Sequence, residues 1–223
     1  MIDKRVEDLA TALCGIKDGS TILVSGFGNA GSPIRLLEAL IDQGATNLTI
    51  VSNNAGEGVF GLAALMKAGR VKKVICSYPR SSGSVIFEEL YEQGKIDLEV
   101  VPQGTLSERM RAAGAGIGGF FTPTSAGTLL GADKETREIE GKLHVFEIPL
   151  KGDVALIKAH AGDRWGNLTY NKSARNFGPT MAMAADLTIA EVRIINELGE
   201  INPEHVVTPG IFVDRLIKLE DEA

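Results

Sequence analysis

Short apolar runs alternate with segments of helical spacing from residue 21 to residue 113, and this alternation constrains the fold more than any other feature. The runs are rich in β-branched residues, and the connections between them are short. The expected strands are 21–24, 48–51, 71–76 and 96–101, and the expected helices are 34–43, 59–68, 84–93 and 105–113. Such an order predicts an α/β fold with an open, mostly parallel sheet, right-handed crossovers and helices on both faces.

The rest of the chain is predicted to be richer in strands. A helix is expected over 3–15. Residues 114–131 are rich in glycine, threonine and serine and are expected to form a loop. Further strands are expected at 143–148, 154–159 and 187–192, a tight turn at 163–168 and a short helix at 179–185. No repeat or low-complexity linker interrupts this order, so one domain over residues 1–223 is expected.

Composition excludes several classes of protein. The hydrophobic share is 44% and the charged share 23%, which are ordinary for a globular chain and argue against extensive disorder. The formal net charge of −6 argues against a chain that coats nucleic acid or an anionic membrane, but it leaves room for a local basic pocket. There is no run of 18 apolar residues, and the first residues lack an apolar signal core. No membrane span and a cytoplasmic location are therefore expected.

The residues that most often bind metals do not form a recognisable set. Cys14 and Cys76 stand in apolar runs and are predicted to be buried thiols. His144, His160 and His205 lack the spacing of metal ligands. No metal site is expected.

A glycine-rich segment lies between the first expected strand of the sheet and the following helix. It reads Val24, Ser25, Gly26, Phe27, Gly28, Asn29, Ala30, Gly31. Glycines let backbone approach a ligand closely, and ligands of parallel sheets bind at the carboxyl ends of strands. The spacing also fits a dinucleotide motif, but the next strand ends in Ser52-Asn53-Asn54 without the acidic residue that such a site needs. The alternative is a purely structural turn.

Amide side chains follow two further strands at the same predicted edge. Asn53 and Asn54 offer hydrogen bonds to a thioester, to a carboxylate or to their own turn. Gln103 follows the strand at 96–101 and precedes a helix. Its amide is a candidate donor to a developing oxyanion, or a simple cap of the turn.

A second glycine cluster lies at residues 114–119, where Gly116, Gly118 and Gly119 stand close together. This density of glycine disfavours a stable helix. It predicts either backbone N–H groups presented to a ligand or a mobile lid, ahead of a merely structural loop.

Taken together, these segments resemble the family I coenzyme A transferases in their A-subunit form. The diagnostic stretch runs from Asp18-Gly19 through Ser25-Gly26-Phe27 to Gly31 and Pro33, with Ser25 where the family usually has the first of two glycines. The resemblance extends from Asp18 to Ile211. It includes the stretches 51–56, 101–106, 174–177 and 208–211.

The resemblance implies a ping-pong transfer of coenzyme A, with coenzyme A as a substrate carrier and not a permanently bound cofactor. The family's nucleophile is a glutamate in a Ser-Glu-Asn-Gly motif, which this sequence lacks; neither Glu57 nor Glu108 has that context. The nucleophile is therefore expected on a partner B subunit, in a heterodimer or heterotetramer. This chain would position substrate and coenzyme A, and Gln103 would supply part of the oxyanion hole.

Within the family, the stretches 76–80 and 158–168 most resemble members that act on 3-oxoadipate. The implied reaction moves coenzyme A from succinyl-CoA to 3-oxoadipate, near the end of aromatic-ring degradation through the β-ketoadipate route. Because both acids are dicarboxylates, the distal carboxylate needs a partner, and Arg80 after the third strand is the candidate. A solvated surface role for Arg80 is the alternative, and Arg164 and Arg175 are weaker candidates.

Three other functions stay open at this point. The first keeps the chemistry but uses acetoacetate or a short-chain fatty acid. The second is a sugar-phosphate isomerase, for which no acid–base residue can be identified. The third is a ligand-sensing module of a regulator, which the acidic net charge disfavours.

Overall fold

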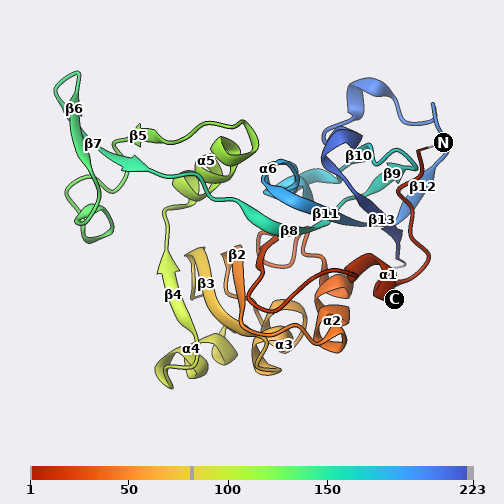
Figure 1. Ribbon diagram of the computed structural model, residues 1–223, viewed down its shortest axis with the longest axis horizontal. Coiled ribbons are helices and arrows are strands. Elements are labelled where there is room, and N and C mark those ends of the chain that lie inside the picture. Colours follow the sequence, from red (N-terminus) through yellow and green to blue (C-terminus); the bar gives the residue numbers. More distant parts are fainter. Residues whose placement is uncertain (1, 81–82, 220–223) are drawn as a thin grey trace.

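The computed structural model describes residues 2–80 and 83–219, and a seven-stranded sheet forms its centre (Figure 1). Every neighbouring pair in this sheet is parallel. In spatial order the strands are β13 (Arg215–Lys218), β11 (Ala185–Val192), β8 (Gly152–Lys158), β1 (Thr21–Val24), β2 (Leu48–Asn54), β3 (Val71–Tyr78) and β4 (Asp97–Val100). The predicted sheet is confirmed.

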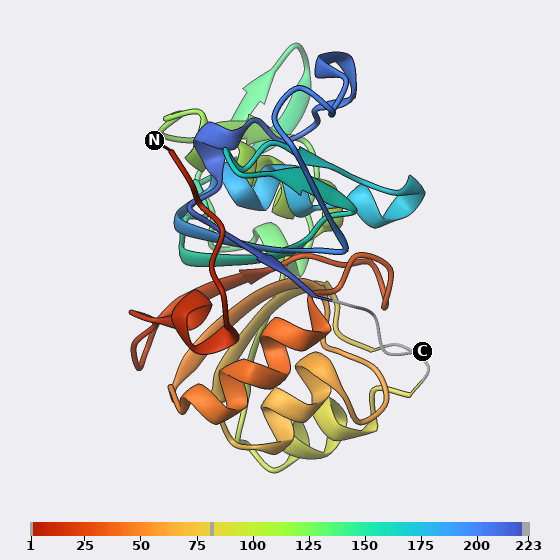
Figure 2. The same cartoon turned by 90° about the vertical axis from the view of Figure 1, so that its right-hand side faces the viewer.

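Helices cover both faces of the sheet, as Figure 2 shows. One face carries α1 (Leu9–Leu13), α2 (Ile34–Gln43), α3 (Gly61–Lys67) and α4 (Val85–Glu92), and the other carries α5 (Gln103–Gly114) and α6 (Gly178–Met183). The side chains of strand β1 point alternately to the two faces of the sheet and so contribute to two separate hydrophobic cores. Ile22 and Val24 pack with α2 and α3, whereas Leu23 packs with α5 and α6.

The predicted helix over 3–15 is wrong for its first half. Helix α1 begins only at Leu9, where the Asp8 carboxylate accepts a hydrogen bond from Thr11 N–H. The preceding residues run alongside β13, because Val6 N–H donates to Leu216 C=O and Leu216 N–H donates to Lys4 C=O. Pairing with a strand more than 200 residues away therefore overrides the local helical spacing.

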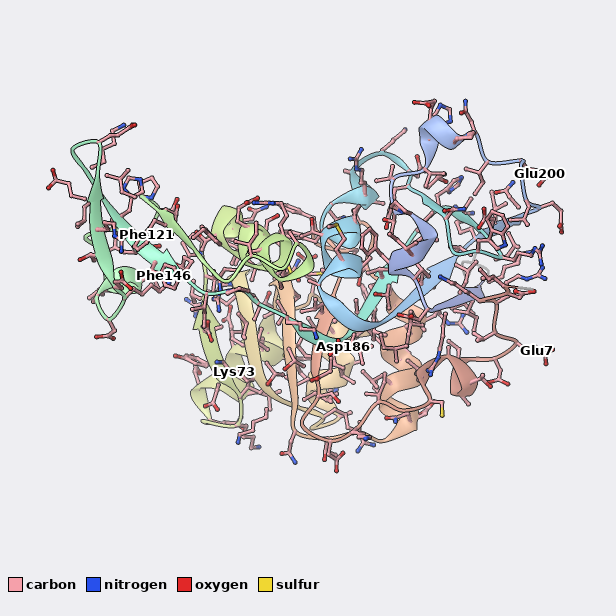
Figure 3. The ribbon with its side chains drawn as sticks, turned by 45° about the horizontal axis from the view of Figure 1, so that its top comes forward. Glu7, Lys73, Phe121, Phe146, Asp186 and Glu200 are labelled. Atoms are coloured by element: carbon pink, nitrogen blue, oxygen red, sulfur yellow. The ribbon has the colours of Figure 1, made fainter. Side chains whose placement is uncertain are left out.

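The segment expected as one long loop contributes to a second sheet. Strands β5 (Phe120–Thr122), β7 (Lys142–Glu147) and β6 (Thr136–Ile139) pair antiparallel, with the turn η1 (Leu129–Gly131) between β5 and β6. Residues 120–147, called the arm below, project from the main sheet in Figure 1. Phe121 and Phe146, labelled in Figure 3, pack against each other within the arm, with their ring centroids 5.1 Å apart.

A third, small sheet lies beyond β8. Strand β9 (Ala161–Asp163) pairs antiparallel with β10 (Leu168–Thr169) and parallel with β12 (Ile194–Asn196). The short turns of this region are η2 (Lys172–Arg175), η3 (Pro203–His205) and η4 (Gly210–Phe212). The turn expected at 163–168 joins β9 to β10.

The order of the strands creates a switch point between β1 and β8. From β1 the chain winds through β2 and β3 to β4, and it then returns to place β8 on the other side of β1. The connections after β1 and after β8 therefore diverge to opposite faces, which opens a crevice at the carboxyl ends of these two strands. The glycine-rich segment 24–31 lies at this point.

The two thiols differ in exposure. Cys76 is fully buried in β3, and desolvation raises the pKa of its thiol to about 12, so it stays protonated and unreactive at neutral pH. The prediction that Cys14 is also buried is wrong. Helix α1 ends at Leu13, and Cys14 is its C-cap residue and is exposed. Across residues 2–80 and 83–219, no helix has the length and hydropathy needed to cross a membrane.

Candidate functional site

A cleft opens at the carboxyl ends of β1, β2 and β3. Its first part has a volume of about 380 Å³, and its lining residues are Phe27, Gly28, Asn53, Asn54, Glu57, Ser77, Tyr78 and Gln103. A second part of about 480 Å³ shares Phe27 and Gln103 and is completed by Gly104, Ser107, Asn176 and Phe177. The combined space is large enough for an organic ligand of moderate size.

The glycine-rich segment forms a tight loop at one wall of this cleft. Phe27 N–H donates to Ala30 C=O at 3.0 Å, and the reverse bond is 3.3 Å. Gly26, Gly28 and Gly31 all have positive φ angles, which only glycine adopts readily. Within the described part of the chain, the backbone N–H groups of Gly28 and Asn29 have no acceptor, so the loop presents donors beside the cleft.

Ser25 explains why the departure from the family pattern leaves the loop intact. Its side chain is buried, and its hydroxyl donates to Gly31 C=O at 2.7 Å. The same oxygen accepts from Lys158 N–H at 3.1 Å. The hydroxyl therefore ties the two ends of the loop together and joins the loop to the end of β8, which a glycine there would not do.

Asn176 holds the loop from the outside. Its side-chain oxygen accepts from Gly26 N–H at 3.0 Å, and its side-chain nitrogen donates to Ala30 C=O at 2.8 Å. The adjacent Ala174 C=O would lie 2.3 Å from a Cβ atom placed on Gly31. The segment 174–176 is thus packed directly against the loop, although nearly 150 residues separate them in sequence.

The two asparagines lie at the end of β2 itself and not beyond it, because β2 extends three residues further than predicted. Asn53 is buried, and its side-chain oxygen accepts from the Ser77 hydroxyl at 2.7 Å. The side-chain oxygen of Asn54 accepts from Gly56 N–H at 2.9 Å, so this oxygen serves its own turn. Both residues also line the cleft.

Gln103 is the first residue of α5 and is exposed to both parts of the cleft. The sequence predicts a helix from residue 105, but α5 begins two residues earlier. Gln103 therefore lies at the N-terminus of the helix and not in the loop before it. Its amide borders the space that Phe27 and Gly28 border on the other side. A neutral donor and the N-terminal end of a twelve-residue helix therefore face the cleft, an arrangement that can stabilise negative charge on an oxygen.

The second glycine cluster does not join this cleft. Gly116, Gly118 and Gly119 follow the carboxyl end of α5, whereas Gln103 lies at its amino end, about 18 Å away along the helix axis. None of the three is among the residues that line the two parts of the cleft. Packing accounts for glycine at position 119, since a Cβ atom there would lie 2.2 Å from the Phe146 ring.

Arg80 also lies outside the cleft that it was expected to serve. Its side chain is 72% exposed and its Nε donates to the Glu88 carboxylate at 3.0 Å. Tyr78, two residues earlier, does line the cleft. The alternative interpretation, an exposed surface arginine, therefore describes Arg80 in this conformation.

Several cleft residues were not predicted as part of the site. Glu57, Ser77 and Tyr78 line the first part of the cleft, and Asn176 and Phe177 line the second. Ser77 and Tyr78 end β3, so the rule that ligands bind at strand ends would have found them. Asn176 carries no such signal, because only the folded chain brings it to the loop.

Comparisons with known proteins show the family of this chain. A sequence model of the family described as coenzyme A transferase matches residues 6–219. This chain belongs to the coenzyme A transferase family. It is 62% identical to the A subunit of 3-oxoadipate CoA-transferase from Pseudomonas putida, over all of this chain and 96% of that protein. It is 58% identical to the protein of the same name from Acinetobacter baylyi, over 99% of this chain and 96% of that one.

A solved structure extends the likeness to the fold. The acyl-CoA transferase of Escherichia coli O157:H7, in a thioester complex with CoA, superimposes with a TM-score of 0.85 at 23% identity. The match covers 99% of this chain but 48% of that chain. The family member described here thus spans about half the length of that transferase.

Proposed function

We propose that this chain is the A subunit of a cytoplasmic CoA-transferase that moves coenzyme A from succinyl-CoA to 3-oxoadipate, in the degradation of aromatic compounds. The observation that carries the proposal is a cleft with polar donors but no family nucleophile. The loop 24–31, Asn53–Asn54 and Gln103 meet at one edge of the sheet, while the chain contains no Ser-Glu-Asn-Gly motif. The substrate follows from the two 3-oxoadipate CoA-transferase relatives.

In this proposal the reaction proceeds through a glutamate of the partner B subunit. Its carboxylate attacks the thioester carbonyl of succinyl-CoA, which releases CoA thiolate and forms a mixed anhydride. The thiolate then attacks the glutamyl carbonyl, giving a glutamyl-CoA thioester and free succinate. 3-Oxoadipate carries out the same two steps in reverse and leaves as its CoA thioester, which regenerates the carboxylate.

The residues of this chain act by binding and by stabilising charge. Gly28 and Gln103 line the cleft in which a tetrahedral oxyanion would form, and Asn29 follows Gly28 in the loop; among the described residues, neither loop N–H group has an acceptor. Such preorganised donors lower the barrier without a proton transfer of their own. Asn53 and Asn54 would orient the acid, and the mobility of segment 116–119 as a lid stays a prediction.

The proposal is tested by reconstitution. The purified chain is assayed alone and mixed with its B partner, with succinyl-CoA and 3-oxoadipate, and 3-oxoacyl-CoA is measured. We expect no turnover from the chain alone and turnover only in the mixture. Turnover by the chain alone would contradict the split site. A mixture that is silent with 3-oxoadipate but active with acetoacetate would overturn the substrate and keep the chemistry.

A substitution of Arg80 tests the distal carboxylate contact. To reach substrate, the Arg80 guanidinium must leave Glu88 for the substrate carboxylate. If it does so, Arg80→Ala raises KM for 3-oxoadipate several-fold more than KM for acetoacetate, which has no second carboxylate. Glu88→Gln is the matched control, since it frees the arginine and should lower KM for 3-oxoadipate or leave it unchanged. Equal effects of Arg80→Ala on both acids would contradict the contact.

A further inference from the structure

The arm presents a strand edge that has no partner within the described part of the chain. Its sheet has the order β5, β7, β6, so β6 pairs with β7 on one side and lies at the edge of the sheet. All residues of β6 are exposed, and the arm projects away from the main sheet in Figure 1. An exposed edge of this kind is a template for pairing with another chain.

The hydrogen bonds to β7 decide which backbone groups of β6 point outward. Phe146 N–H donates to Glu135 C=O at 2.8 Å, and the register of the two strands, continued by one residue, places Glu135 opposite Phe146. In an antiparallel pair, such hydrogen-bonded positions alternate with positions that are not hydrogen-bonded. The N–H and C=O groups of Glu135 and Arg137 therefore point toward β7. Those of Thr136 and Glu138 point away from it.

The charges along this edge are complementary to themselves in an antiparallel arrangement. The order is Lys134, Glu135, Thr136, Arg137, Glu138, so residues at equal distances before and after Thr136 have opposite charges. A two-fold axis through Thr136 would place each charged residue opposite an oppositely charged residue of a second copy. The side chains of Glu135 and Arg137 are 59% and 62% exposed, so both can reach another chain.

Hydrogen-bond geometry limits the registers in which two copies of β6 can pair. Outward-facing residues must meet outward-facing residues, so the two-fold axis passes through a residue and not between two residues. An axis at Arg137 or at Glu138 sets two identical charges opposite each other, and an axis at Ile139 pairs two acidic residues; such pairs are destabilising. An axis at Thr136 instead sets Arg137 opposite Glu135 of the second copy. That pair is not hydrogen-bonded, so its side chains lie closest together.

Contacts within the arm hold the charged groups of this edge in place. The Arg137 guanidinium lies 4.5 Å from the centroid of the Phe121 ring, which Figure 3 labels, and 3.5 Å from the Glu135 carboxylate. A guanidinium has five donors, so it can keep these contacts and also bind a second carboxylate. Lys134 is already paired with Glu147. The charge complementarity therefore depends mainly on Arg137 and Glu135.

We propose that the β6 edge of the arm is an interaction surface for a second copy of this chain, with the two β6 strands antiparallel and the two-fold axis at Thr136. The three-stranded sheets of the two arms would then join into one continuous sheet. The charged residues of this edge do not line the cleft, so the inference does not rest on the proposed function. A single pair of short strands is a small interface, and weak association is expected.

Cysteine cross-linking of the full chain tests the contact and its register. The variants are Thr136→Cys and Glu138→Cys, each combined with Cys14→Ser, which removes an exposed thiol and leaves the buried Cys76. Mild oxidation should convert Thr136→Cys into a disulfide-linked dimer, because residues that face each other across the axis lie within reach of a disulfide. Glu138→Cys is the matched control on the same exposed strand. In the proposed register its two thiols are about 13 Å apart along the strands, too far for a disulfide.

The outcomes separate the proposed pairing from the alternatives. A dimer that forms at least several-fold faster with Thr136→Cys than with Glu138→Cys supports the proposal. Equal rates for the two variants, or no dimer from either, overturn it. The measurement is repeated with the B partner present, and the cross-link should persist. Its loss there would also overturn the proposal, because the B partner would then cover the β6 edge.

A charge swap separates the contact from the integrity of the arm. Arg137→Glu, added to Thr136→Cys, places carboxylates opposite each other and should slow cross-linking about tenfold. Further addition of Glu135→Arg restores opposite charges across the axis, and the rate should recover. Damage to the arm alone would not be repaired by the second substitution. An unchanged rate with Arg137→Glu, or no recovery with the swap, overturns the pairing.

Discussion

Alanine in place of Gly31 should destabilise the protein by about 2–5 kcal/mol and lower kcat/KM of the A–B complex by about 100-fold or more. The residue has a φ of +74°, and its added Cβ atom would lie 2.3 Å from Ala174 C=O. A backbone carbonyl cannot rotate away as a side chain can, so the loop or the segment 174–176 must move. Either movement displaces the Gly28 and Asn29 N–H groups. Denaturant unfolding and steady-state kinetics measure the two effects.

Gly69 offers a matched control for this substitution. Its φ is +72°, but a Cβ atom placed there would meet nothing within 4 Å. Gly69→Ala therefore isolates the cost of the left-handed backbone, about 1–2 kcal/mol, and should leave kcat/KM unchanged. Similar losses of stability and activity in both variants would show that the contact with Ala174 does not restrain the loop.

The place of the loop could be predicted from the sequence, but its supports could not. A glycine-rich stretch between an apolar run and a helix start is a local pattern, and the sheet rule then assigns it to the ligand edge. Its supports, Ser25 bonded to Lys158 and Asn176 bonded to Gly26, join residues more than 130 positions apart. No spacing along the chain encodes such a contact.

The same distinction divides the rest of the fold. Strands and helices from residue 21 to 113 follow their local periodicity, because neighbouring elements in sequence are neighbours in the sheet. Residues 2–8 and the strands β5 and β6 of the arm do not follow it, whereas β7 matches the strand expected at 143–148. Val6 is held by Leu216, and Phe121 packs on Phe146, so distant contacts decide the conformation of each segment. Segment 116–119 is separated from the cleft residue Gln103 by the length of α5, which no local pattern reveals, and its contact with a ligand stays a prediction.

Substitution of Arg109 by methionine should destabilise the chain by about 2–4 kcal/mol, because it removes one of two cations from a buried carboxylate and the charged donor from Ile148 C=O. Arg109 on α5 is 8% exposed, and its Nε lies 3.9 Å from the Glu147 carboxylate and donates to Ile148 C=O at 2.9 Å. Glu147, at the end of the arm, is 2% exposed and is also paired with Lys134. Arg109 thus joins α5 to the arm through Glu147 and to β4 through Glu99. Urea unfolding at neutral pH measures the loss.

The surface pair Lys151–Asp186 is the control for that experiment. Its ammonium and carboxylate lie 2.5 Å apart, closer than Arg109 and Glu147, but both side chains are more than 60% exposed. Lys151→Met should therefore cost less than about 1 kcal/mol. The double variant Arg109→Met with Glu147→Leu should recover most of the loss, since the buried carboxylate is gone and Lys134, whose side chain is 29% exposed, can reach water. Equal costs for the two single variants would mean that burial does not govern these pairs.

The effect of Arg109→Met should also depend on pH in a defined direction. Burial acts to raise the pKa of Glu99, but hydrogen bonds and charge from Lys73 and Arg109 outweigh it and hold that pKa below the ordinary value of 4.5. Lys73, labelled in Figure 3, lies on β3 beside the edge strand β4 that carries Glu99. A carboxyl with a lowered pKa contributes stability above its unfolded pKa and loses it as the pH falls through the folded value. The difference in unfolding free energy between wild type and variant should thus be full at pH 7 and shrink below about pH 4. A difference that stays constant down to about pH 3 would show that Arg109 acts by packing and not by charge.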